Sequence, residues 1–167
     1  KTEREIQASL DEVSAERTAR TREAWGADPA RTVILLAARL AEWKGHRLLI
    51  AAMARSSARE RALLVFTGDG ERASYAAELM ALARASGVAL KVAGPGADMP
   101  AALAAADFVA APSTSPESFG RSVAEAGAMG KVVIASRLGG PAETILDGQT
   151  GWLAPPGDEG AWARALD

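Results

Sequence analysis

The sequence predicts an α/β protein with a parallel, doubly wound sheet of about six strands and helices on both faces. Two observations lead to this fold class. Short apolar runs alternate with helix-prone segments along the whole chain, and the most conspicuous glycine and charged motifs come directly after those runs. The chain has 167 residues, which suits one domain, and 49% of them are apolar, which is enough for a core.

The elements follow in order. A polar segment at 14–25 is helix-prone, with Ser14 as its N-cap, and Gly26 ends it. The first predicted strand, TVILLA, is rich in branched residues, as expected of a strand buried on both faces. The predicted strands are 32–37, 62–67, 88–93, 108–111, 132–136 and 151–154. The predicted helices between and after them are 48–54, 71–86, 99–106, 120–129, 141–146 and 162–167. Right-handed crossovers between such strands give a Rossmann-like sheet whose ligands bind at the carboxyl ends of the strands.

Composition excludes several function classes. The net charge of -2 offers no basic footprint for nucleic acid. Cysteine is absent and His46 is the single histidine, which excludes disulfides, Cys-ligated zinc and a His-rich metal site. No apolar run approaches the roughly 20 residues that cross a bilayer, and no signal peptide is evident. The chain starts without Met and stops within a helical pattern, so we expect it to be a piece of a longer protein.

Two cations follow the first predicted strand. Arg39 and Lys44 are five residues apart and can converge on one anion such as a diphosphate. The alternative is that both are solvated surface charges. Trp43 lies between them in sequence and for that reason is expected near any pocket they form.

The segment from Pro112 to Glu125 carries the strongest signal. It follows a strand and opens a helix, so the amides of residues 118–121 are expected at a helix N-terminus, which favours anions. Glu117 lies before that helix and Glu125 lies about one and a half turns inside it. Carboxylates accept hydrogen bonds from the vicinal hydroxyls of sugars and ribose. Small apolar neighbours suggest that Glu125 is partly buried and needs a partner.

Three weaker signals remain. Gly68-Asp69-Gly70 is explained by turn chemistry. Gly139-Gly140 could present amides to a ligand or could serve packing, and the sequence does not decide between these. His46 is expected to be a non-catalytic surface or capping residue. No Asp-x-Asp motif is present to hold a metal–diphosphate complex, so we expect no metal and no other cofactor.

From residue 14 to its end the chain resembles the C-terminal, donor-binding domain of the large family of retaining glycosyltransferases with the GT-B fold. Each matching motif is weak alone, but together they occur in the family's order and spacing. The pair Glu117 and Glu125, with seven residues between them, is the most specific. The other matches are Arg39-Leu40, Lys44-Gly45, Gly68-Asp69-Gly70, Ala106-Asp107, Pro112-Ser113, Phe119-Gly120, Gly139-Gly140, Glu143, Asp147-Gly148 and Thr150-Gly151.

The resemblance implies roles for individual residues. Arg39 and Lys44 would neutralise the donor diphosphate, and Glu117 would bind hydroxyls of the transferred sugar. The amides of Ser118, Phe119 and Gly120 would face the phosphates and the sugar. Glu125 would hold the ribose, and the segment 91–94, including Val92 and Gly94, would border the base. Ala38 departs from the family, which more often has Gly there.

The implied protein is a retaining, metal-independent glycosyltransferase of lipopolysaccharide, glycoconjugate or lipid synthesis. Residues 14–167 would form the nucleotide-sugar-binding domain, and residues 1–13 have no assigned role. The acceptor would bind an N-terminal domain outside this chain, so the fragment alone would show little activity. The expected location is the cytoplasm or the inner face of the membrane. The alternatives are a non-catalytic nucleotide-binding module, a sugar-nucleotide epimerase and a dinucleotide-dependent oxidoreductase. The last is disfavoured because no Gly-x-Gly-x-x-Gly follows the first strand.

Overall fold

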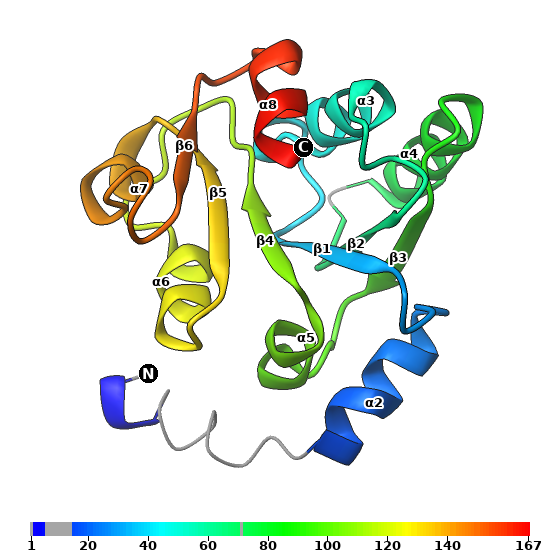
Figure 1. Cartoon of the computed structure of the whole chain (residues 1–167), viewed down its shortest axis with the longest axis horizontal. Coiled ribbons are helices and arrows are strands. Elements are labelled where there is room, and N and C mark those ends of the chain that lie inside the picture. Colours follow the sequence, from blue (N-terminus) through cyan, green and yellow to red (C-terminus); the bar gives the residue numbers. More distant parts are fainter. Residues whose placement is uncertain (1, 6–14, 71) are drawn as a thin grey trace.

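Six parallel strands form the centre of the molecule in the order β3–β2–β1–β4–β5–β6 (Figure 1). The structure is a computed structural model that describes residues 2–5, 15–70 and 72–167. The strands are β1 (Thr32–Ala37), β2 (Ala62–Thr67), β3 (Leu90–Gly94), β4 (Phe108–Ala111), β5 (Val132–Ser136) and β6 (Trp152–Ala154). The predicted fold class and all six predicted strands are confirmed.

Helices cover both faces of this sheet. They are α2 (Ala15–Ala24), α3 (His46–Arg55), α4 (Ala73–Ala85), α5 (Met99–Ala105), α6 (Arg121–Ala128), α7 (Gly139–Thr144) and α8 (Glu159–Leu166), with a short 3₁₀ turn, η1 (Glu42–Lys44). In Figure 1, α3, α4 and α8 lie on one side and α5 and α6 on the other, and α2 packs against α5. Ser14, the predicted N-cap, lies outside the described residues, and of segment 1–13 only residues 2–5 are described.

The core explains why the strands are apolar throughout. In β1, Ile34 and Leu36 enter the core on one face, while Val33 and Leu35 enter the core on the other. All four side chains are at most 2% exposed. Burial on both faces leaves no solvated positions, so the sequence shows a continuous apolar run instead of an alternating one.

The order of the strands places a candidate binding site. The chain first builds outward from β1 through β2 to β3, and then returns to the opposite side of β1 to build β4, β5 and β6. The direction therefore reverses between β1 and β4. The chain leaves β1 toward α3 on one face of the sheet and leaves β4 toward α6 on the other, and ligands of such sheets bind at this point (Figure 1).

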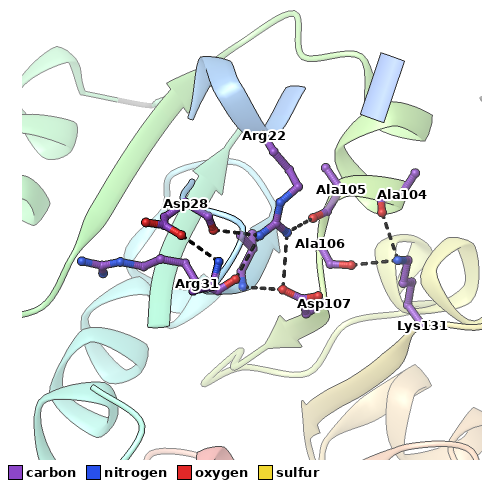
Figure 2. Close-up of polar contacts among 10 residues, drawn as sticks. Arg22, Asp28, Arg31, Ala104, Ala105, Ala106, Asp107 and Lys131 are labelled. Atoms are coloured by element: carbon purple, nitrogen blue, oxygen red, sulfur yellow. Dashed lines mark hydrogen bonds and ion pairs between the residues drawn. The ribbon is translucent and has the colours of Figure 1, made fainter. Parts of the chain in front are cut away.

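At the opposite, amino edge of the sheet, the polar side chains of Arg22, Asp107 and Lys131 form hydrogen bonds with the backbone at the ends of helices and strands (Figure 2). The Arg22 guanidinium donates to the carbonyls of Ala105 and Arg31, each at 2.9 Å. The Asp107 carboxylate accepts from the Val33 amide at 2.7 Å. The Lys131 ammonium donates to two carbonyls at the end of α5, of Ala104 and Ala106, at 3.0 and 2.8 Å. These side chains satisfy backbone groups that the ends of helices and strands leave unpaired.

Candidate functional site: a pocket at the carboxyl ends of β1 and β4

A pocket of about 460 Å³ lies at the point where the strand order reverses. Its walls come from the end of β1, from η1, from the first residue of α5, and from the loop between β4 and α6 with the first turns of α6. The lining residues are Ala37, Trp43, Lys44, Met99, Pro116, Glu117, Ser118, Phe119, Gly120, Arg121, Ser122 and Glu125. The sequence-based site residues Lys44, Glu117, Ser118, Phe119, Gly120 and Glu125 are thus brought together, and Trp43 joins them as expected.

Close backbone contact joins the two loops that form the pocket. The Trp43 carbonyl accepts a hydrogen bond from the Thr114 amide at 2.8 Å. Gly45, with φ of 84°, lies against Pro112, and a Cβ at this position would collide with the Pro112 carbonyl. Only glycine fits both the left-handed conformation and this close approach. The residue after Lys44 therefore holds the Lys44 turn against the loop that carries Glu117.

The Gly139-Gly140 pair supports the Glu117 loop from behind. The Gly140 amide donates to the Glu117 carbonyl at 2.8 Å. A Cβ on Gly139 would collide with the Glu117 carbonyl, and one on Gly140 would lie 2.7 Å from the Phe119 carbonyl carbon. The sequence left open whether these glycines serve a ligand or packing. The structure favours packing, because the Gly140 amide is already bonded and both glycines lie against the loop.

The centre of the pocket holds an ion pair between Lys44 and Glu117. The Lys44 ammonium contacts the Glu117 carboxylate and also lies over the Trp43 ring, 4.1 Å from its centroid. The side chains of Lys44 and Glu117 are only 19% and 13% exposed. Partial burial weakens solvent screening, so each charge here depends on the other for compensation.

A second ion pair lies on α6. Arg121 contacts Glu125 one turn later on the helix, with 3.4 Å between Nε and Oε1. The Glu125 side chain is 21% exposed, which confirms that it is partly buried and has a charged partner. Arg121 was missed in the sequence analysis, although its (i, i+4) spacing to Glu125 is the usual signal for such a pair. The charged groups lining the pocket are thus two cations, each paired with a carboxylate.

The entry into α6 is shaped by Gly120. Its φ of 68° is left-handed, and it precedes the first helical residue, Arg121. A Cβ on Gly120 would lie 2.8 Å from the Pro141 ring, so this position also needs glycine. The first amides of a helix have no partner within the helix, and Arg121 and Ser122 of that first turn line the pocket. Phe119 stands at the pocket 65% exposed.

A family model described as "Glycosyl transferases group 1" matches residues 31–167. The D-inositol 3-phosphate glycosyltransferase of Mycobacterium sp. (strain KMS) is 34% identical over 162 residues, which is 95% of this chain and 36% of the relative. The enzyme of the same name from Segniliparus rotundus is 38% identical over 134 residues, which is 77% of this chain and 30% of the relative. The chain belongs to the glycosyl transferases group 1 family. It spans about a third of the length of these curated relatives.

Solved structures agree with the family. A glycosyltransferase from Rickettsia africae matches with a TM-score of 0.88 and 26% identity, over 95% of this chain and 42% of that one. Anabaena HepE in complex with UDP and glucose matches with a TM-score of 0.86 and 32% identity, over 96% of this chain and 44% of that one. HepE has also been solved with UDP-glucose. The sheet is therefore the Rossmann-like sheet of GT-B glycosyltransferases.

Three site residues that the family resemblance suggested lie outside the pocket lining. Arg39 is exposed just after β1 and is engaged in an interaction of its own. Val92 and Gly94 lie on β3, the edge strand two positions from β1, where Val92 packs against the core. Met99, which the sequence analysis did not propose, lines the pocket from the start of α5. No local sequence signal marks Met99, because only the position of α5 beside β1 brings it there.

His46 corrects the sequence-based expectation of a surface or capping residue. Its side chain is 0% exposed and stacks edge-on against Phe66 and Tyr75, with ring centroids 4.9 and 6.3 Å away. Burial lowers its pKa to about 4; the nearby Ala41 backbone opposes part of this shift and the Lys44 charge adds to it. The expectation was wrong because His46, Leu49, Ile50 and Met53 share one apolar helix face, which sequence spacing alone could have shown.

Within residues 2–5, 15–70 and 72–167, no group of three or more His, Cys, Asp or Glu side chains is placed to hold a metal ion. Over the same ranges, no helix has the length and apolar character needed to span a membrane.

Proposed function

We propose that this domain binds the nucleotide-diphosphate sugar from which the full-length protein transfers a glycosyl group with retention of anomeric configuration. The observation that carries the proposal is the pairing of charges in the pocket. Lys44 is paired with Glu117, and Arg121 with Glu125. A nucleotide sugar offers phosphate oxygens to the cations and pairs of hydroxyls to the carboxylates. One ligand can therefore replace the partners of both ion pairs without leaving any of the four charged groups lacking a hydrogen-bond partner.

The proposed roles are those that the family resemblance suggests, and the pocket position of Lys44, Glu117 and Glu125 supports them. Lys44 and the first amides of α6 bind the diphosphate, with Arg39 assisting if its side chain turns toward the ligand. Glu117 binds hydroxyls of the transferred sugar, and Glu125 holds the ribose. As the glycosidic bond breaks, negative charge grows on the leaving diphosphate. A lysine already placed beside that position stabilises the charge without further reorganisation, which is the electrostatic form of catalysis.

The comparisons support the donor class. HepE, at 32% identity, binds UDP and UDP-glucose. The curated relatives are named as glycosyltransferases acting on D-inositol 3-phosphate. For this chain we propose a nucleotide-sugar donor that needs no metal, and an acceptor that binds outside these residues. Synthesis of lipopolysaccharide, glycoconjugates or glycolipids, in the cytoplasm or at the inner face of the membrane, is the proposed setting.

Calorimetric titration with uridine, UDP and UDP-glucose, each with and without Mg²⁺, tests the proposal. Glu125→Ala is expected to weaken all three ligands about tenfold, because each contains the ribose. Glu117→Gln is expected to lower the affinity for UDP-glucose but not the affinity for uridine or UDP. UDP affinity should hold or rise in this variant, because Lys44 is released from its carboxylate partner.

The outcomes separate the alternatives. Equal losses for UDP and UDP-glucose in Glu117→Gln would contradict the assignment of Glu117 to the sugar. UDP binding that requires Mg²⁺ would contradict metal independence. Preferential binding of a nicotinamide dinucleotide would overturn the proposed function. Because the ligands of HepE do not fix the base that this chain binds, GDP and ADP belong in the same titration.

A further inference from the structure

Trp43 is the one aromatic side chain in contact with the Lys44 ammonium among the described residues. Lys44 Nζ lies over the face of the indole, 4.1 Å from the ring centroid, within the range of a cation–π interaction. Trp43 and Lys44 are neighbours in η1, so the ring and the ammonium are carried by the same short turn. The proposed function above assigned a role to Lys44 and none to Trp43.

Trp43 is held in place by contacts with the loop after β4 as well as by its contact with Lys44. Its carbonyl accepts from both the amide and the hydroxyl of Thr114, at 2.8 and 3.3 Å. The next loop contact is Gly45 against Pro112. Thr114 and Pro112 belong to the same loop as Glu117. The backbone of Trp43 therefore lies where the two loops that form the pocket meet, and its side chain lines that pocket.

The two partners of Lys44 differ in what happens when a ligand arrives. Glu117 neutralises the ammonium and competes with any anion for it. The indole face attracts the ammonium but leaves its charge uncancelled and its hydrogen-bond donors free. A lysine side chain otherwise has several rotatable bonds, and ordering it on binding costs entropy.

We propose that Trp43 is a positioning residue that holds the Lys44 ammonium in the pocket when the donor diphosphate displaces it from Glu117. The proposal rests on the proposed function, because it takes the ligand of Lys44 to be the diphosphate. Its effect is to keep the cation in place before, during and after the exchange of partners. Trp43 acts through Lys44 and makes no hydrogen bond to the ligand in this scheme.

A double-mutant cycle on UDP affinity tests it, using the chain as it stands. Trp43→Leu is expected to weaken UDP about threefold to tenfold. In a Lys44→Met background the same change is expected to have no effect, because the group on which Trp43 acts is gone. Trp43→Phe, which keeps a ring, should restore most of the affinity. Trp152→Leu, at a 52% exposed tryptophan outside this pocket, is the matched control and should bind UDP like the parent.

Two results would overturn the proposal. If Trp43→Leu weakens UDP equally with and without Lys44, the indole contacts the ligand or supports the fold. A ligand-free measurement separates this failure from failure of the proposed function. The Lys44 ε-methylene protons should be shifted upfield by the indole ring relative to those of exposed Lys91, and Trp43→Leu should abolish the shift. Unshifted Lys44 protons in the parent would refute the positioning role whether or not UDP binds.

Discussion

The carboxyl and amino edges of the sheet use the same kinds of side chain in opposite ways. At the amino edge, Arg22 and Lys131 donate to backbone carbonyls (Figure 2). At the carboxyl edge, Lys44 and Arg121 are paired with carboxylates beside an open pocket. A carbonyl that terminates a helix cannot leave its position, whereas a carboxylate in a pocket can exchange a cation for a hydroxyl. Arg22 also contacts the Asp107 carboxylate at 3.4 Å, but that carboxylate is itself held by the Val33 amide. Cations bonded to the backbone stabilise the fold, whereas cations whose carboxylate partners lie in the pocket remain available to a ligand.

Among the variants that test this difference between the two edges, Arg22→Ala is expected to have the largest effect on stability. It leaves the Ala105 and Arg31 carbonyls without their donor, which should lower the free energy of unfolding by about 3 kcal/mol. For a chain of this size the Tm should fall by roughly 6 to 12 °C. UDP affinity, measured below the new Tm, should stay within about twofold, because the pocket lies at the other edge.

Arg20→Ala is the matched control on the same helix. Arg20 is 67% exposed and pairs with Glu16 at the surface of α2, so its removal should cost less than about 1 kcal/mol. Urea unfolding of both variants gives the comparison. A loss of UDP affinity in Arg22→Ala alongside its loss of stability would show that the two edges are coupled.

Lys44→Ala is expected to have a large effect on UDP affinity and a smaller effect on stability than Arg22→Ala. Loss of one charge-assisted contact to a phosphate should weaken UDP about tenfold to a hundredfold. Stability should fall by only about 1 to 2 kcal/mol, less than in Arg22→Ala, because Glu117 loses its partner but at 13% exposure is still partly solvated. Arg164→Ala, at an exposed arginine of α8 outside the pocket, controls for the loss of net charge. If the unfolding midpoint falls while affinity holds, Lys44 is a structural residue like Arg22.

The sequence predicted the sheet well because strands buried on both faces have a distinctive composition. It was less accurate where a helix ends. The third strand was expected from Val88, but it begins at Leu90, because the Val88 amide bonds back to the Ala83 carbonyl and closes α4. That closure depends on Gly87 at φ 70°, a feature of backbone geometry rather than of hydrophobic pattern.

The pocket shows a similar limit. Lys44 and Glu117 were predicted from motifs that follow strands, and the fold brings them together. Arg39 was grouped with Lys44 by spacing, yet the two ends of the loop after β1 form hydrogen bonds with different neighbouring loops. The residue after Arg39, Leu40, bonds to Asp69 beyond β2, whereas Trp43 bonds to Thr114 beyond β4. Spacing along a loop does not show which neighbouring loop each part will contact.

The smallest expected effect concerns His46, which lies at the carboxyl edge yet belongs to the core. Its pKa is about 4 in the folded chain and near 6.5 when unfolded, so protonation favours unfolding. Its stabilising effect is complete above pH 6.5 and is lost as the pH falls toward 4. Between pH 7.5 and pH 6 the loss should be about 1 kcal/mol. Urea unfolding at the two pH values should show this difference in the parent and not in His46→Leu.

The depressed pKa of Asp98, caused first by Arg17, affects stability only at lower pH, so it does not contribute between pH 7.5 and pH 6. An equal pH dependence in both proteins would mean that His46 is not the titrating group. The terminal phosphate of UDP has a second pKa of about 6, so a fall in UDP affinity over the same window is expected in both proteins. A larger fall in the parent than in His46→Leu would mean that the core beneath Lys44 is coupled to the pocket, and that the carboxyl edge is less purely a binding surface than the charge pairing indicates.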